Sequence, residues 1–141
     1  MEEQKALGAW GEEEACRHLR RRGYAVLDRN ARAAWGELDV VARAPDRTLV
    51  FIEVKTLHTR PPEGLEPEDH MTAGKMERFR RAASLYAGSH PRLVDAARGW
   101  RLDVLAIAVP PPTPAARPGF LTRFLRRARP SFTIRHYENI G

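Results

Sequence analysis

The chain of 141 residues has one cysteine, three lysines and no long hydrophobic run. A single thiol, Cys16, excludes an internal disulfide and cannot by itself form a cysteine-based zinc site. No window reaches the roughly 18 apolar residues of a membrane span. The acidic N-terminus also lacks the basic and apolar regions of a signal peptide. These absences predict a cytoplasmic protein with no membrane partner.

Positive charge is carried almost entirely by arginine. There are 21 arginines against three lysines, and the formal net charge is +6. A basic surface attracts polyanions, so nucleic acid is the first partner that the composition indicates. The alternative is that arginine enrichment reflects the base composition of the genome and that the charge only aids solubility.

The length is that of one domain with a core of a few layers. We expect residues 1–109 to form this core. Residues 110–141 would then hold a Pro-rich linker at 110–118, a short basic helix at 120–129 and an edge strand at 132–137.

The stretch GELDVVARAPDRTLVFIEVK predicts a β-hairpin. Two runs of β-branched and bulky apolar residues, 38–41 and 49–52, flank residues 44–47, which have turn chemistry. If the turn has an odd number of residues, or contains a bulge, positions whose numbers sum to 92 face one another. Asp39 then lies opposite Glu53, with their Cβ atoms about 5 Å apart.

Two half-buried carboxylates at such a separation repel each other unless a cation lies between them or one is protonated. Mg²⁺, with Mn²⁺ as a substitute, suits oxygen ligands of this kind. Lys55 follows Glu53 on the same face, about 7 Å along the strand, where its ammonium would meet a metal-bound phosphate. The hairpin thus predicts a site for a metal ion and a phosphate.

Helical patterns lie on both sides of the hairpin. Residues 4–22 predict an amphipathic helix that ends at Gly23, and Glu12 falls within its apolar arc whereas the neighbouring glutamates point elsewhere. From the pattern alone, Glu12 is a helix carboxylate paired with a nearby arginine. A second helix is expected from the N-cap Thr72 to residue 88.

Three further segments complete the pattern. Residues 24–32 predict a strand, residues 59–69 a loop beside the proposed site, and residues 100–109 a central strand. Arg101 and Asp103 share one face of this last strand, which favours a structural ion pair over a direct part in chemistry.

Asp39 followed by Glu53-Val54-Lys55 resembles the PD-(D/E)xK nuclease signature. The motifs GELD, VFIEVKT, MT followed by Lys75, and RLDV are similar to those of the YraN-like bacterial proteins. These are described as predicted endonucleases distantly related to Holliday junction resolvases. The resemblance spans roughly residues 6–108.

This resemblance implies a restriction-endonuclease-like α/β sandwich, with a central mixed sheet flanked by helices in the order α-β-β-β-α-β and a C-terminal extension. The local patterns agree with it. It also implies Mg²⁺-dependent hydrolysis of DNA, on branched or recombination and repair intermediates. By analogy with resolvases, it suggests a homodimer.

The resemblance also implies roles for single residues. Asp39, Glu53 and the carbonyl of Val54 would hold the metal, and Glu12 would reach it from the first helix. Lys55 would orient the attacking water or stabilise the transition state. The remaining candidates are Glu37, behind the metal ligands, and the DNA-binding residues Lys75, Arg78, Arg81, Arg123, Arg126 and Arg127.

A rival interpretation is a non-catalytic DNA-binding or scaffold protein on a nuclease-like fold, since a fold does not fix an activity. The intact Asp39, Glu53 and Lys55 argue against it, because paired acids repel phosphate when no metal is present. The sequence leaves open whether DNA or RNA is cut, and which substrate structure is recognised.

Overall fold

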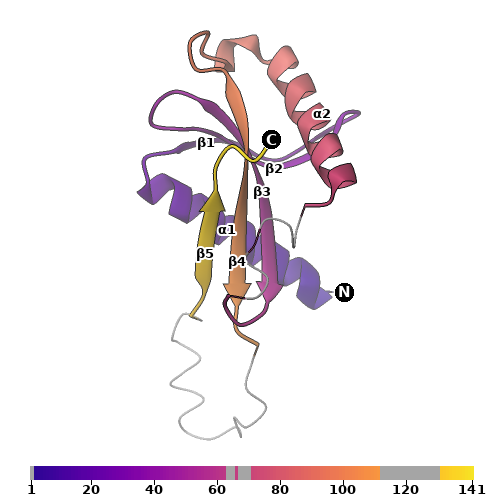
Figure 1. Ribbon diagram of the computed structural model, residues 1–141, viewed down its shortest axis with the longest axis vertical. Coiled ribbons are helices and arrows are strands. Elements are labelled where there is room, and N and C mark those ends of the chain that lie inside the picture. Colours follow the sequence, from indigo (N-terminus) through magenta and orange to yellow (C-terminus); the bar gives the residue numbers. More distant parts are fainter. Residues whose placement is uncertain (1, 63–65, 67–70, 112–130) are drawn as a thin grey trace, which may run out of the picture.

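A five-stranded mixed β-sheet forms the centre of the molecule (Figure 1). The structure is a computed structural model that describes residues 2–62, 66, 71–111 and 131–141. β3 and β4 are parallel, whereas the other neighbouring strands are antiparallel. In spatial order the strands are β1 (Ala25–Ala33), β2 (Gly36–Arg43), β3 (Leu49–His58), β4 (Trp100–Val109) and β5 (Thr133–Tyr137).

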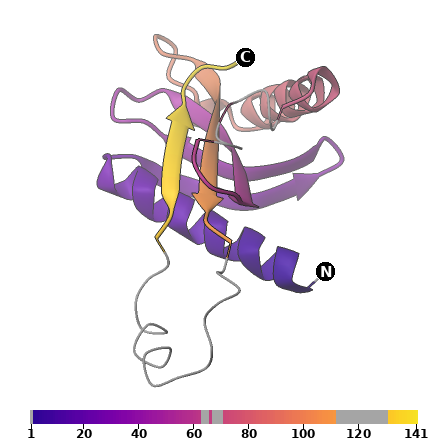
Figure 2. The same ribbon diagram turned by 60° about the horizontal axis from the view of Figure 1, so that its bottom comes forward.

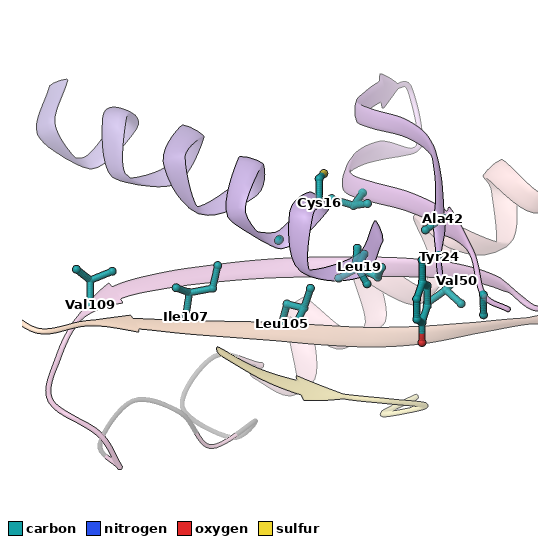
Figure 3. Close-up of a cluster of buried hydrophobic side chains, with 12 residues drawn as sticks. Cys16, Leu19, Tyr24, Ala42, Val50, Leu105, Ile107 and Val109 are labelled. Atoms are coloured by element: carbon teal, nitrogen blue, oxygen red, sulfur yellow. The ribbon is translucent and has the colours of Figure 1, made fainter. Parts of the chain in front are cut away.

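Helix α1 (Glu2–Arg21) covers one face of this sheet. Figure 2 shows it crossing beneath the strands, and Figure 3 shows the apolar side chains between helix and sheet. Because strand side chains alternate, one set of alternate residues from β3 and β4 meets the helix. This core includes Cys16 and Leu19 of α1, Val50 and Ile52 of β3, and Leu105, Ile107 and Val109 of β4.

The end of α1 follows from its sequence. Gly23 has a φ of +85°, and the N–H of Tyr24 donates to the carbonyl of Leu19 at 3.0 Å. This is a Schellman cap, in which a residue without Cβ occupies the left-handed conformation at low cost. The predicted helix and its end at Gly23 are confirmed.

Helix α2 (Ala73–Ser89) packs on the opposite face of the sheet. Its Phe79, Ala83 and Tyr86 join Val41 and Phe51 in a second core. The hydroxyl of Thr72 accepts a hydrogen bond from the N–H of Lys75 at 3.2 Å, so the predicted N-cap is confirmed. A short 3₁₀ helix, η2 (Pro91–Leu93), precedes β4.

The predicted α/β class, with helices on both faces of a mixed sheet, is confirmed. The predicted strands correspond to β1, β2, β3, β4 and the edge strand β5. The linker and the basic segment at 120–129, with Arg123, Arg126 and Arg127, lie outside the described residues apart from positions 110 and 111. The same holds for part of the loop at 59–69. Within the described chain, no helix is long and apolar enough to cross a membrane.

Asp103 fixes the C-terminal strand through a buried ionic network. Its carboxylate is fully buried and lies 3.1 Å from Nε of Arg101 and 2.7 Å from Nε2 of His136 in β5. The backbone N–H of Asn139 donates to the same carboxylate at 2.9 Å. Burial raises the pKa of Asp103, but these three partners outweigh it and hold that pKa below its usual range. The structural ion pair predicted for Arg101 and Asp103 is confirmed.

Replacing Asp103 by Asn should destabilise the protein by about 3–5 kcal/mol, because the largely buried Arg101 would lose its nearest carboxylate and keep only the exposed Glu138, 3.8 Å away. Chemical denaturation measures the change. Because the folded-state pKa of Asp103 is lowered, its stabilising effect should be present above about pH 4 and fade as pH falls through the folded pKa. The control is Glu77→Gln, which removes an exposed ion pair with Arg80. An equal effect of the two substitutions would contradict this role.

Candidate functional site

The site begins where β2 and β3 separate. Val40 lies opposite Ile52 and Val41 opposite Phe51, so the predicted register, in which paired numbers sum to 92, is confirmed. The pairing stops at Val40, one step before Asp39 and Glu53. If the pairing continued, Val54 would bond to the β2 backbone. Instead, the N–H of Val54 donates to Oδ2 of Asp39 at 2.9 Å.

The environment of Asp39 disfavours its negative charge. Burial, together with the neighbouring carboxylate of Glu53, raises the pKa of Asp39 to about 7. The hydrogen bond from Val54 opposes this rise, and the charge of Glu12 adds to it. The structure therefore places Asp39 and Glu53 close enough to repel each other, as the hairpin register predicted.

Lys55 compensates part of this charge. Its Nζ lies 3.7 Å from Oε1 of Glu53, and the two side chains are 29% and 24% exposed. Both residues lie within β3, on the face that α2 covers, because Phe51 of the same alternating set packs against α2. An ammonium and a carboxylate thus stand together at the surface of the sheet.

Glu12 approaches the site from the other helix because α1 lies unusually close to β3. A Cβ at Gly11 would collide with Oγ1 of Thr56, the residue that follows Lys55. Glycine therefore permits a contact that brings the next residue, Glu12, near enough to influence Asp39. The expectation that the neighbouring glutamates point elsewhere is wrong for Glu14, which is buried and lies 3.2 Å from Arg17.

A cleft of about 760 Å³ opens beside Glu53 and Lys55. One wall is formed by Trp35, in the turn between β1 and β2, and by Glu37 at the start of β2. The carboxylate of Glu37 also lies 3.3 Å from Arg32. The other wall is α2, where three predicted DNA-binding residues line the cleft: Lys75, Arg78 and Arg81. The structure thus brings these three together with Glu53, Lys55 and Glu37.

Sequence reasoning missed the apolar lining of this cleft. Met71, Phe79 and Leu85 stand beside the basic residues, and Leu85 is 44% exposed. The sequence did contain one signal for this lining, because Leu85 lies on the side of α2 that is otherwise basic.

Comparison with known proteins places this chain in a family. The profile described as uncharacterised protein family UPF0102 matches residues 11–107. The chain belongs to this family, the YraN-like group that its motifs resemble. The matched region contains Glu12 and every proposed site residue of β2, β3 and α2.

The relatives share much of the chain. A UPF0102 protein of Roseiflexus castenholzii is 45% identical over 103 residues, which are 73% of this chain and 79% of that protein. A UPF0102 protein of Frankia alni is 42% identical over 115 residues, or 81% of this chain and 90% of the relative. Membership is therefore firm, whereas the names of these relatives state no activity.

The close approach of α1 can be tested by adding one methyl group. Gly11→Ala should destabilise the fold by about 1–3 kcal/mol, since the new Cβ would overlap Thr56. Adding Thr56→Ala should restore part of the loss, a coupling that a double-mutant cycle of denaturation measurements detects. Gly8→Ala is the control, because nothing lies within 4 Å of its added Cβ. Additive effects of the two substitutions would disprove the contact.

The carboxylate repulsion predicts a pH dependence of folding. Because the folded-state pKa of Asp39 is raised, folding is favoured fully below about pH 4, and this contribution is lost as pH rises through about 7. The free energy of unfolding of Asp39→Asn should therefore rise by roughly 2 kcal/mol relative to that of the parent between pH 4.5 and 8. This value allows for the solvent that screens part of the interaction.

Urea denaturation in a chelator measures this difference. Glu37→Gln, which alters an exposed carboxylate of the same strand, keeps Asp39 and should therefore follow the pH dependence of the parent. If Asp39→Asn follows the parent at every pH, the two carboxylates do not interact as the structure indicates.

Proposed function

We propose that this protein is a metal-dependent endonuclease that hydrolyses DNA phosphodiester bonds. The observation that carries the proposal is the pair Asp39 and Glu53, in which burial and the neighbouring Glu53 carboxylate together raise the pKa of Asp39 to about 7. Beside the pair, Lys55 lines a cleft whose α2 wall is basic. A purely structural role gives no reason to keep two repelling acids beside a surface that attracts anions.

The donor set fits Mg²⁺, with Mn²⁺ as a substitute. Magnesium commonly binds through one or two carboxylates and leaves its other positions to water and substrate phosphate. Among the described residues, no three His, Cys, Asp or Glu side chains form a metal-binding group. We therefore assign Asp39 and Glu53 as the acidic ligands, with the Val54 carbonyl beside them and Glu12 as a supporting charge from α1.

The bound cation would activate a water molecule and neutralise charge on the scissile phosphate. Lys55 then stabilises the negative charge that grows on the phosphate oxygens, since its ammonium lies 3.7 Å from Glu53. Glu37, which lines the cleft without binding the metal, offsets part of the positive charge of the neighbouring basic residues. Lys75, Arg78 and Arg81 bind flanking phosphates, and we assign the same task to Arg123, Arg126 and Arg127.

The fold supports this proposal without deciding it. A helix, a hairpin-led mixed sheet and a second helix on the opposite face are consistent with a restriction-endonuclease-like core. The competing function is a DNA-binding scaffold that does not cut. Branched or repair intermediates and a homodimeric state remain predictions from the family resemblance.

Two substitutions test the chemistry. Asp39→Asn should abolish the rise in melting temperature that Mg²⁺ or Ca²⁺ causes in the parent, because one acidic ligand is lost.

Lys55→Ala should slow DNA cleavage about 100-fold or more while most DNA affinity remains, since many arginines share the phosphate contacts. Thermal melting, gel cleavage assays with Mg²⁺ and fluorescence anisotropy provide the three measurements.

Arg80→Ala is the matched control, because Arg80 lies on α2 but does not line the cleft. It should keep both metal response and cleavage. If the parent binds DNA but cuts no branched or linear substrate in Mg²⁺ or Mn²⁺, the scaffold function replaces the nuclease.

A further inference from the structure

The cleft beside Glu53 has two kinds of lining that suit different parts of a nucleotide. Lys75, Arg78 and Arg81 bring three positive charges from α2. Apolar surface comes from Trp35, in the turn between β1 and β2, and from Leu85, which follows the basic residues toward the C-terminal end of α2. A sugar-phosphate backbone matches the first lining, and the face of a base matches the second.

The basic residues form a regular row. Lys75, Arg78 and Arg81 are three positions apart on α2, so each step rises about 4.5 Å along one side of the helix. Leu85 lies one turn beyond Arg81. Of the described residues, only Leu85 and Leu57 are large apolar side chains with substantial exposure, at 44% and 39%. Leu57 does not line the cleft, so Leu85 marks an apolar patch at the end of the row.

Trp35 is held in place rather than free in solvent. Its ring meets Tyr86 edge to face, with centroids 5.8 Å apart and planes at 83°. It is half-buried and still lines the cleft. A ring that its neighbours already immobilise loses little side-chain entropy when a base packs against it.

An intact duplex does not match this lining. It presents phosphates outward and keeps the base faces stacked inside, where Trp35 and Leu85 cannot reach them. The cleft volume of about 760 Å³ lies in the range of pockets that enclose a small molecule, roughly 300–1,000 Å³. That scale suits a few nucleotides of one strand, not a double helix.

We infer that the cleft holds a single DNA strand with its bases unstacked. Its phosphates lie along Lys75, Arg78 and Arg81, and at least one base packs against Trp35 and Leu85. The inference rests on the proposed function for its consequence. The strand enters the site at Glu53 and Lys55, so DNA with a single-stranded arm is bound and cut in preference to uninterrupted duplex.

Binding of the full chain is measured first, in chelator so that no DNA is cut. Fluorescence anisotropy compares a forked DNA that has single-stranded arms with a fully paired duplex of equal length. We expect the fork to bind at least about 10-fold more tightly, and Leu85→Ala to weaken the fork by about 5- to 10-fold and leave the duplex unchanged. Leu57→Ala is the matched control, an exposed leucine outside the cleft, and should change neither.

Arginines of α2 give a second matched pair. Arg78 lines the cleft and Arg80 does not. Arg78→Ala should weaken fork binding and flatten its dependence on salt by about one unit of log–log slope. Arg80→Ala should leave the slope of the parent.

Tryptophan fluorescence reports the base contact directly. The single-stranded arm should quench the emission of the parent, and Trp35→Phe should remove that quenching while Trp10 and Trp100 remain. Equal affinity for fork and duplex, or quenching that persists in Trp35→Phe, would overturn the inference. Cleavage of duplex in Mg²⁺ would still support the nuclease. Preference for the fork without cleavage of any DNA would reject the nuclease and keep the strand-binding cleft.

Discussion

The N–H of Val54 donates to the Asp39 carboxylate at the point where β2 and β3 separate. This hydrogen bond replaces a bond of the sheet, so the two strands can part without leaving a buried donor unpaired. It also holds Asp39 beside Glu53, in a position where burial and repulsion from Glu53 raise the pKa of Asp39. The fold stores electrostatic energy here, and a bound cation would release it.

The rest of the structure keeps these strands in place from both faces. On the face with the first core, Gly11 lets α1 approach Thr56 of β3, and that contact also brings Glu12 toward Asp39. On the other face, the side chains of α2 that point inward form a second core, whereas its Lys75 and Arg78 face the cleft. Each helix therefore serves packing and the site at once.

Asp103 stabilises a different part of the fold, the edge of the sheet formed by β4 and β5. A fully buried carboxylate is costly unless it is paired, and here Arg101 and His136 supply the partners. Since His136 belongs to β5, the network ties the last strand to β4 and closes the sheet at that edge. This network stabilises the fold, and none of its residues has a role in the proposed cleavage reaction.

The sequence by itself determined the periodic elements and limited the register of the hairpin to what the turn length allows. Strand alternation placed Asp39 beside Glu53 on the condition that the turn had an odd length or a bulge, and the structure met that condition with the pairs Val40–Ile52 to Arg43–Leu49. Tertiary structure alone decided the approach of α1, the burial of Glu14 and the meeting of Trp35 with Leu85 across a cleft. These depend on how distant elements pack, and no local pattern encodes the distance between two helices and a sheet.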